Sequence, residues 1–226
     1  MSILRRRGPV PSKHVPPARP LNPIRQKGVT VVTQHIENIA RRSFYDALSR
    51  LFIAPGAAGT VPALCEGFVA AAAFATELGV DACAFERAAE ASWPDEAHLG
   101  AEYAKLFTGP DAIALCESAW ADKGAPVTPL AQLECRGAYL EAGLETAALN
   151  GIQEDHLGVE AAFMSVLILQ EKPREATDFF TAHLARWLPA FIDSVREHPE
   201  ALYFRVVADV LERALDMEKT LHEESR

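Results

Sequence analysis

The stretch Gly151–Gln170 reads GIQEDHLGVEAAFMSVLILQ, and its two halves differ in chemistry. The first half carries Glu154, Asp155 and His156, whereas the second, up to its final glutamine, has Ser165 as its only polar residue. An apolar block without a polar face predicts a helix that is buried on most sides. Asp155 is expected to cap this helix, because its carboxylate can accept bonds from the first-turn amides and suits the helix dipole. We therefore expect a central core helix whose acidic entrance loop lies at the surface.

Helix-forming patterns flank this stretch on both sides. Apolar residues recur at helical spacing, and prolines, glycines and aspartates stand where helices begin or end. The expected helices cover approximately residues 36–51, 62–78, 81–93, 95–107, 128–150, 173–187 and 199–217. The helix at 128–150 is expected to carry Leu133, Gly137, Leu140 and Leu144.

The same patterns predict the fold class. Residues 29–32 are a weak candidate for a strand, and no longer alternating pattern occurs. Pro189 is expected to kink the helix that Pro173 opens or to split it in two. The chain therefore reads as all-α, with about eight or nine helices in a single globular domain around a buried central helix. This domain is expected to span residues 29–226.

Charge divides the chain into a basic tail and an acidic body. The formal net charge is −9, but seven basic residues precede the first acidic residue, Glu37. Residues 1–28 are also rich in proline, so we expect a disordered basic tail. The remaining body has 15 basic and 31 acidic residues, a net charge of about −16. Such a body disfavours nucleic acid as a partner and favours a cationic one.

The sequence also indicates a compartment. No apolar run is long enough to span a membrane, and no apolar segment follows the early arginines, as a secretory signal would require. The four cysteines, Cys65, Cys83, Cys116 and Cys135, lack CxxC spacing. Reduced and mostly buried thiols are the simplest interpretation. We therefore expect a cytoplasmic protein.

Polar residues at the start of the core helix could carry chemistry. His156 and Glu160 are four residues apart and share a helix face with Asp155 close by. A helical metal- or small-ligand-binding protein or enzyme would use these three residues, although no HExxH or EF-hand pattern is present. The alternative is a capping network in which His156 bonds a neighbouring carboxylate. His183 and Trp187 share an apolar stripe and are interpreted as packing residues.

A binding site is the other possibility. The long connection at residues 108–128 follows Phe107 and includes Gly109 and Trp120, and it is expected near the acidic loop. An apolar groove with carboxylates at its rim would bind an apolar peptide that carries arginines, because the planar guanidinium pairs with carboxylates. For Tyr103 and Trp120 the alternative is an ordinary place in the core.

Three blocks of the sequence resemble a known family. The first is EYAKLFTGP at residues 102–110 with ESAW at residues 117–120, the second is EDHL at residues 154–157 with Phe163-Met164, and the third is FTAHLARWLPAF at residues 180–191 with Tyr203-Phe204. In this order and spacing they resemble the TorD/DmsD/NarJ family of redox-enzyme maturation chaperones. The resemblance covers roughly residues 33–217.

The resemblance implies an all-helical cytoplasmic chaperone that is not an enzyme and needs no cofactor or metal of its own. Its partner would be the apo catalytic subunit of a molybdopterin-dependent oxidoreductase, or that subunit's twin-arginine signal peptide. Binding would aid cofactor insertion and prevent premature export. The residues that the resemblance assigns to client binding are Tyr45, Tyr103, Leu106, Phe107, Gly109, Pro110, Ser118, Trp120, Glu154, Asp155 and His156.

Two further expectations concern assembly and the tail. Family members occur as monomers or as dimers that exchange helices, and residues 151–155 are a plausible hinge. The run Arg5-Arg6-Arg7 could instead occupy the acidic site of its own chain and compete with clients.

Overall fold

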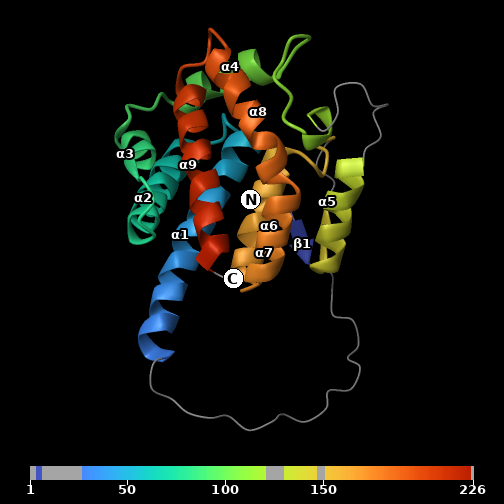
Figure 1. The fold of residues 1–226 in the computed structure, drawn as a ribbon. Helices are drawn as coiled ribbons and strands as arrows, with labels where there is room; N and C mark the ends of the chain where they lie inside the picture. The colour runs from blue at the N-terminus through green and yellow to red at the C-terminus, as the bar shows by residue number, and fades with distance from the viewer. Residues whose placement is uncertain (1–3, 7–26, 121–129, 147–150, 225–226) are drawn as a thin grey trace.

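The computed structural model describes residues 4–6, 27–120, 130–146 and 151–224. Within these ranges nine α-helices, one 3₁₀ helix and two three-residue strands follow one another (Figure 1). They are β1 (Leu4–Arg6), α1 (Lys27–Ile53), α2 (Thr60–Glu77), α3 (Cys83–Glu90), α4 (Glu96–Phe107), η1 (Glu117–Ala119), α5 (Leu130–Glu141), β2 (Leu144–Thr146), α6 (Leu157–Leu169), α7 (Pro173–Ala182), α8 (Leu184–Glu197) and α9 (Tyr203–Glu224). The expected all-α class is confirmed. None of the described helices combines the length and apolarity that a membrane crossing requires.

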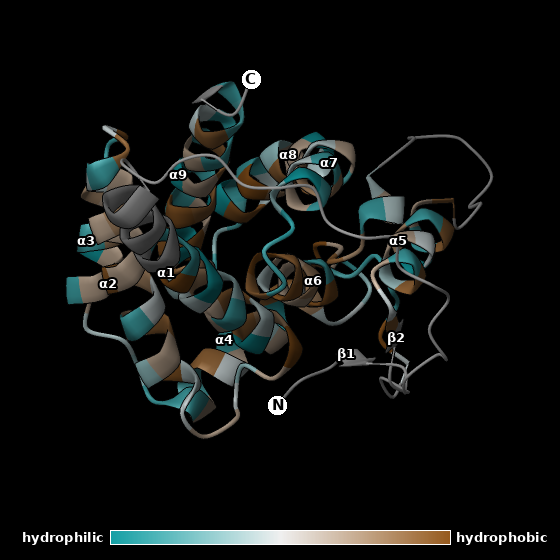
Figure 2. Cartoon of the chain, turned by 90° about the horizontal axis from the view of Figure 1, so that it is seen from below, coloured by the Kyte–Doolittle hydropathy of each residue, from teal (hydrophilic) through white to brown (hydrophobic). Residues whose placement is uncertain are grey.

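The central helix is α6, as predicted. Ten of its 13 residues are buried, and its mean hydropathy is the highest of the helices described. In Figure 2 its largely apolar ribbon lies between α1 on one side and α5 on the other, with α7 and α8 alongside. Helices α1 and α7 pack against it, and its partly exposed residues are Ala162, Val166 and Leu169.

Two glycines allow α1 to approach its neighbours closely. A Cβ at Gly67 of α2 would lie 2.8 Å from the Cβ of Ala47, and a Cβ at Gly158 of α6 would lie 2.6 Å from Cγ1 of Ile53. Both distances are shorter than carbon atoms tolerate, so a side chain at either position would push α1 away. The tight contacts of α1 with α2 and α6 thus depend on these two residues.

The last helix, α9, takes its N-terminal cap from another helix. The carboxylate of Glu102 in α4 accepts hydrogen bonds from the amides of Leu202, Tyr203 and Phe204 at 2.8, 3.2 and 3.0 Å. These amides lack partners within α9, and a negative charge at this end also suits the helix dipole. Glu102 is itself buried, at 8% exposure.

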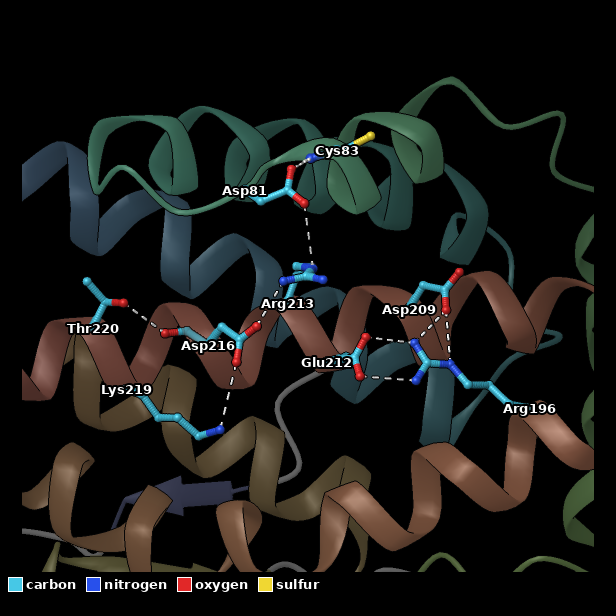
Figure 3. Close-up of polar contacts among 9 residues, drawn as sticks. All are labelled: Asp81, Cys83, Arg196, Asp209, Glu212, Arg213, Asp216, Lys219 and Thr220. Atoms are coloured by element: carbon cyan, nitrogen blue, oxygen red, sulfur yellow. Dashed lines mark hydrogen bonds and ion pairs between the residues drawn. The ribbon is translucent and has the colours of Figure 1, made fainter.

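The solvent side of α9 carries a set of ion pairs that we call the α9 network: Arg196, Asp209, Glu212, Arg213 and Asp216 (Figure 3). Arg196 of α8 lies 2.6 Å from Asp209 and 2.9 Å from Glu212, while Arg213 lies 3.0 Å from Asp216 and 3.9 Å from Asp81. Each carboxylate in this network therefore has an arginine partner. Together the pairs join α9 to α8 and to the segment before α3.

Several element boundaries differ from those expected. Residues 29–32, the weak strand candidate, lie within α1. The helix expected at 128–150 ends at Glu141 and is followed by β2. The helix that Pro173 opens is interrupted at His183, six residues before Pro189, because His183 leaves the helical conformation whereas Pro189 continues within α8. The last helix begins at Tyr203 and not at Pro199, since Glu102 sets its start.

The tail is described only in part. Residues 4–6 form β1, which pairs antiparallel with β2 so that Arg5 stands opposite Glu145. The rest of the tail expected at residues 1–28, up to the start of α1, lies outside the described residues.

Candidate functional site

Two loops that are far apart in the sequence lie side by side at the start of α6. The amide of Glu117 donates to the carbonyl of Asp155 at 2.9 Å, and the amide of Leu157 donates to the carbonyl of Leu115 at 2.8 Å. An isolated antiparallel bridge joins the same two loops. These backbone bonds thus bring the ESAW segment at residues 117–120 next to the EDHL segment at residues 154–157.

The cap of α6 is His156, so the prediction that Asp155 caps this helix is wrong. His156 is the last extended residue before the helix, and its Nδ1 accepts a bond from the amide of Gly158 at 3.1 Å. Burial lowers the pKa of His156 to about 4, although the charge of Asp155 opposes this shift. The neutral imidazole can therefore accept the capping bond. The expected capping network is present, but without a carboxylate bonded to His156 among the described contacts.

Asp155 instead bonds the other loop. One of its oxygens, Oδ2, accepts a hydrogen bond from the amide of Ser118 at 2.9 Å. The second, Oδ1, is buried and has no hydrogen-bond partner among the described residues. A buried carboxylate oxygen without a donor is costly, so this atom marks a place where a donor from another molecule would be stabilising.

The acidic loop is buried, whereas the sequence led us to expect it at the surface. Asp155 is fully buried, and Glu154 and His156 are 7% and 9% exposed. The reason is that α5 covers the loop. The hydroxyl of Tyr139 donates to the carbonyl of Glu154 at 2.8 Å, and Nε of Arg136 donates to its carboxylate at 2.7 Å.

Next to these loops lie four buried ionisable residues, Glu117, Cys135, Glu160 and His183, which we call the buried cluster. Nδ1 of His183 lies 2.7 Å from a carboxylate oxygen of Glu117 and 3.6 Å from the sulfur of Cys135. Glu160 accepts a hydrogen bond from the indole of Trp187 at 3.2 Å and lies 3.8 Å from the sulfur of Cys135. Three elements and the junction between α7 and α8 meet here.

Burial sets the charge states in the cluster. It raises the pKa of Glu160 well above its ordinary value, and the nearby charge of Glu117 adds to this effect. Burial likewise raises the pKa of the Cys135 thiol, and the charge of Glu160 reinforces the shift. Both shifts favour the neutral forms, because a further negative charge in this apolar region would have no compensating cation.

Three members of the buried cluster have the geometry of a metal site. The ligand atoms of Glu117, Cys135 and His183 lie within 4.8 Å of one another. Sulfur, nitrogen and oxygen ligands of this kind suit a divalent ion such as zinc. The trio expected from the sequence was a different one, and its histidine uses Nδ1 to cap α6. The metal-site hypothesis therefore moves to residues from three separate segments.

The aromatic residues expected to form a groove pack against each other at the edge of the core. Leu106 and Phe107 are buried, and Tyr103 and Trp120 are half-buried. The ring of Trp120 stacks on that of Trp187 with 6.4 Å between centroids, so it stands over the residue that bonds Glu160. The ring of Tyr103 contacts that of Phe107 with 5.1 Å between centroids.

The remaining site residues divide between the surface and the part of the core around α1. Gly109, with a φ of 119°, and Pro110 form an exposed turn after α4. Tyr45 is buried in α1 beside Glu218 of α9, and burial raises its pKa. No hydrogen bond or ring contact among the described residues joins Tyr45 to the two loops.

Sequence reasoning missed the roles of Glu117 and His183. Glu117 was quoted only as part of a motif, and His183 was interpreted as a packing residue. Their pairing could have been suspected, because an ionisable residue between Phe180 and Trp187 on an apolar stripe needs a buried partner. Which carboxylate would supply that partner depends on the meeting of η1 with the α7–α8 junction, and no local pattern shows this.

Comparison with known proteins gives one match. A family model described as nitrate reductase delta subunit matches residues 71–193, which is more than half of the chain. This region includes both loops and the buried cluster, but not Tyr45. No curated protein matches the chain, and no solved structure matches it.

Proposed function

The chain belongs to the nitrate reductase delta subunit family, a family of molybdoenzyme maturation chaperones, and on this basis we propose that it binds the apo catalytic subunit of a molybdopterin-dependent oxidoreductase. Binding would include the twin-arginine signal peptide where the subunit has one. The chaperone would act in the cytoplasm, before export, and would hold the client until its cofactor is inserted. Its role would be binding without catalysis.

The observation that carries this proposal is the unpaired oxygen of Asp155. This atom is buried at the junction of the two loops that the family model covers. Beside it Glu117 pairs with His183, whereas Glu160 is bonded by the indole of Trp187 and by no basic residue among those described. An arginine of the client would supply the missing donor and a positive charge, and its planar group can bond two carboxylate oxygens at once.

Trp120 supports the proposal as the residue that controls access. It is half-buried, and its indole donates to the carbonyl of Ala114 at 3.1 Å while its ring covers Trp187. Displacing Trp120 would open a path toward Glu160 and would expose apolar rings for the client's apolar residues. Exposed ion pairs contribute only about 0–1 kcal/mol, so burial of apolar surface would supply most of the affinity.

The test compares two tryptophans. Trp93 is half-buried like Trp120, and its indole also donates to a carbonyl, that of Ala88 at 2.8 Å, but it lies between Phe68 and Tyr203. We expect Trp120→Ala to weaken binding of the apo catalytic subunit of a nitrate reductase-type molybdoenzyme about tenfold or more, the effect of a hot-spot residue. Trp93→Ala should change it by less than about twofold.

Replacing one of two aspartates by asparagine in the same assay tests whether binding depends on the charge of the side chain. Asp155→Asn keeps the size of the side chain and removes its charge, and Asp209→Asn does the same in the α9 network. Isothermal titration calorimetry of the full chain should show weaker binding only for the first. If the apo subunit binds all four variants as tightly as the native chain, the site is wrong. If the native chain does not bind it at all, the function is wrong.

A metal site is the second candidate, and the convergence of Glu117, Cys135 and His183 favours it. Protein purified without chelators would then contain one equivalent of metal. Cobalt added to the apo protein would give a sulfur-to-metal absorption band that Cys135→Ser removes and Cys83→Ser, at an exposed thiol, retains. Absence of both signals would exclude this candidate and leave the chaperone proposal untouched.

A further inference from the structure

Helix α5 is apolar on two opposite faces. Its inner face buries Ala131, Cys135 and Tyr139 against the rest of the molecule. Its outer face carries Leu130, Leu133 and Leu140, whose exposed fractions are 57%, 52% and 43%. Figure 1 shows α5 at the edge of the molecule, and Figure 2 shows it beyond α6 on the side away from α1. Three half-exposed leucines on one short helix are a surface that a partner would bury.

The spacing of these residues is that of a coiled-coil contact. Leu130, Leu133, Gly137 and Leu140, which we call the α5 seam, follow one another at intervals of three, four and three residues. This is the heptad pattern that places residues in one row against a partner helix. An added Cβ at Gly137 would meet no atom within 4 Å, so the middle of the seam is open and a partner helix could approach closely there.

The charges beside the seam are negative. Glu134 and Glu141 lie on the exposed side, one residue after Leu133 and Leu140, where coiled coils place the charges that select a partner. Neither has an ion-pair partner among the described residues. The basic residue of this helix, Arg136, is held by Glu154 at the inner loop. The outer face therefore offers leucines and unpaired carboxylates.

We propose that the α5 seam binds the apolar segment of the client's signal as a helix, with the basic residues of that segment paired to Glu134 and Glu141. This inference rests on the proposed function and adds the surface and the form of the bound peptide. A second copy of this chain is a poorer occupant, because its α5 brings the same carboxylates and an arginine already engaged by Glu154. A segment with an apolar row and arginines complements both features of the seam.

The inner and outer faces of α5 would then act on one client. Through Glu154 the inner face holds the loop that carries Asp155. A segment bound at the seam would therefore lie on the same helix that holds the Asp155 loop.

The probe is a synthetic peptide with two arginines followed by a leucine-rich helical segment, titrated into the full chain. Leu133→Glu tests the seam, and Leu169→Glu is its matched control, because Leu169 is also helical and is also 52% exposed. We expect Leu133→Glu to weaken peptide binding at least about tenfold, and Leu169→Glu to change it by less than about twofold.

A charge reversal adds a second readout. Glu134→Arg combined with Glu141→Arg should weaken binding of this peptide, and should restore binding when the arginines of the peptide are replaced by glutamates. Native affinity in Leu133→Glu, or no response to the charge reversal, would overturn the proposal.

The outcomes also separate this inference from the proposed function. If Trp120→Ala weakens peptide binding and Leu133→Glu does not, the chaperone function stands and the seam is wrong. If the native chain binds neither the peptide nor the apo catalytic subunit, both are wrong. A native dimer in light scattering that Leu133→Glu dissociates would show that a second copy occupies the seam, and would overturn the proposed occupant.

Discussion

The α9 network and the buried cluster are built from the same kinds of residue but differ in their balance of charge. In the α9 network every carboxylate has an arginine partner, and the side chains remain partly in water. In the buried cluster Glu117 pairs with His183, whereas Glu160 is bonded by the indole of Trp187, and burial raises the pKa of Glu160 well above its ordinary value. The first arrangement is complete by itself. The second contains a carboxyl group, that of Glu160, without a basic partner among the described residues, and ionisable groups with strongly shifted pKa values are common at functional sites.

The largest expected difference between the two regions is in the cost of removing the basic partner of a carboxylate. His183→Ala leaves the buried carboxylate of Glu117 without its partner, and such a change costs about 3–5 kcal/mol. Urea unfolding followed by circular dichroism would measure this loss.

The matched change in the α9 network is Arg196→Ala. Its partners Asp209 and Glu212 are about half exposed and can be solvated by water, so the expected cost is below about 1 kcal/mol and should shrink further in high salt. Equal decreases in the free energy of unfolding for Arg196→Ala and His183→Ala would show that the ion pair of the buried cluster contributes no more to stability than a surface ion pair.

An effect of intermediate size, between those of His183→Ala and Arg196→Ala, concerns pH at the edge of the buried cluster. His156 has a folded pKa of about 4 and an ordinary value of 6.5, so the unfolded chain takes up a proton first as the pH falls. The free energy of unfolding should therefore decrease between these two values. In His156→Asn the asparagine is still a good helix cap, but the titrating group is gone. Between about pH 7 and about pH 4.5 the free energy of unfolding of this variant should therefore decrease by about 2–3 kcal/mol less than that of the native chain.

The α9 network provides the control for this pH effect. Hydrogen bonds from Arg196 lower the pKa of Glu212, so its stabilising contribution is present above the unfolded value and is lost only as the pH falls below it. Glu212→Gln should therefore leave the pH dependence of the free energy of unfolding unchanged between about pH 7 and about pH 5. If His156→Asn also leaves that range unchanged, His156 is not held neutral in the folded chain.

Much of the fold could be predicted from the sequence, because helices and their ends are local. The apolar run of α6, Pro173 at the start of α7 and the cap of α4 by Asp95 are all readable from neighbouring residues. The start of α9 could not be predicted, since its cap comes from Glu102, about a hundred residues earlier. Local patterns do not show which distant residue satisfies a helix end.

Part of the candidate site could be predicted from the sequence, but Glu117 and His183 were not expected to take part in it. Asp155, His156, Ser118 and Trp120 do meet at two joined loops, yet the expected roles of Asp155 as a cap and of the loop as a surface feature were wrong. Burial of the loop depends on α5, whose inner face is set by Cys135 and Tyr139. The leucines of α5 had been expected as the apolar positions of that helix, and two of them, Leu133 and Leu140, face solvent.

The capping of α9 by Glu102 also has a consequence for the order in which the molecule is completed. During synthesis α4 leaves the ribosome well before α9, so the acceptor for the last helix is in place before its amides exist. The C-terminal helix therefore closes onto a body that is already assembled. In a chain that lacks Glu102 the last helix would form without its N-terminal cap. This helix would be the first part of the molecule to unfold locally and the first to be cleaved by a protease.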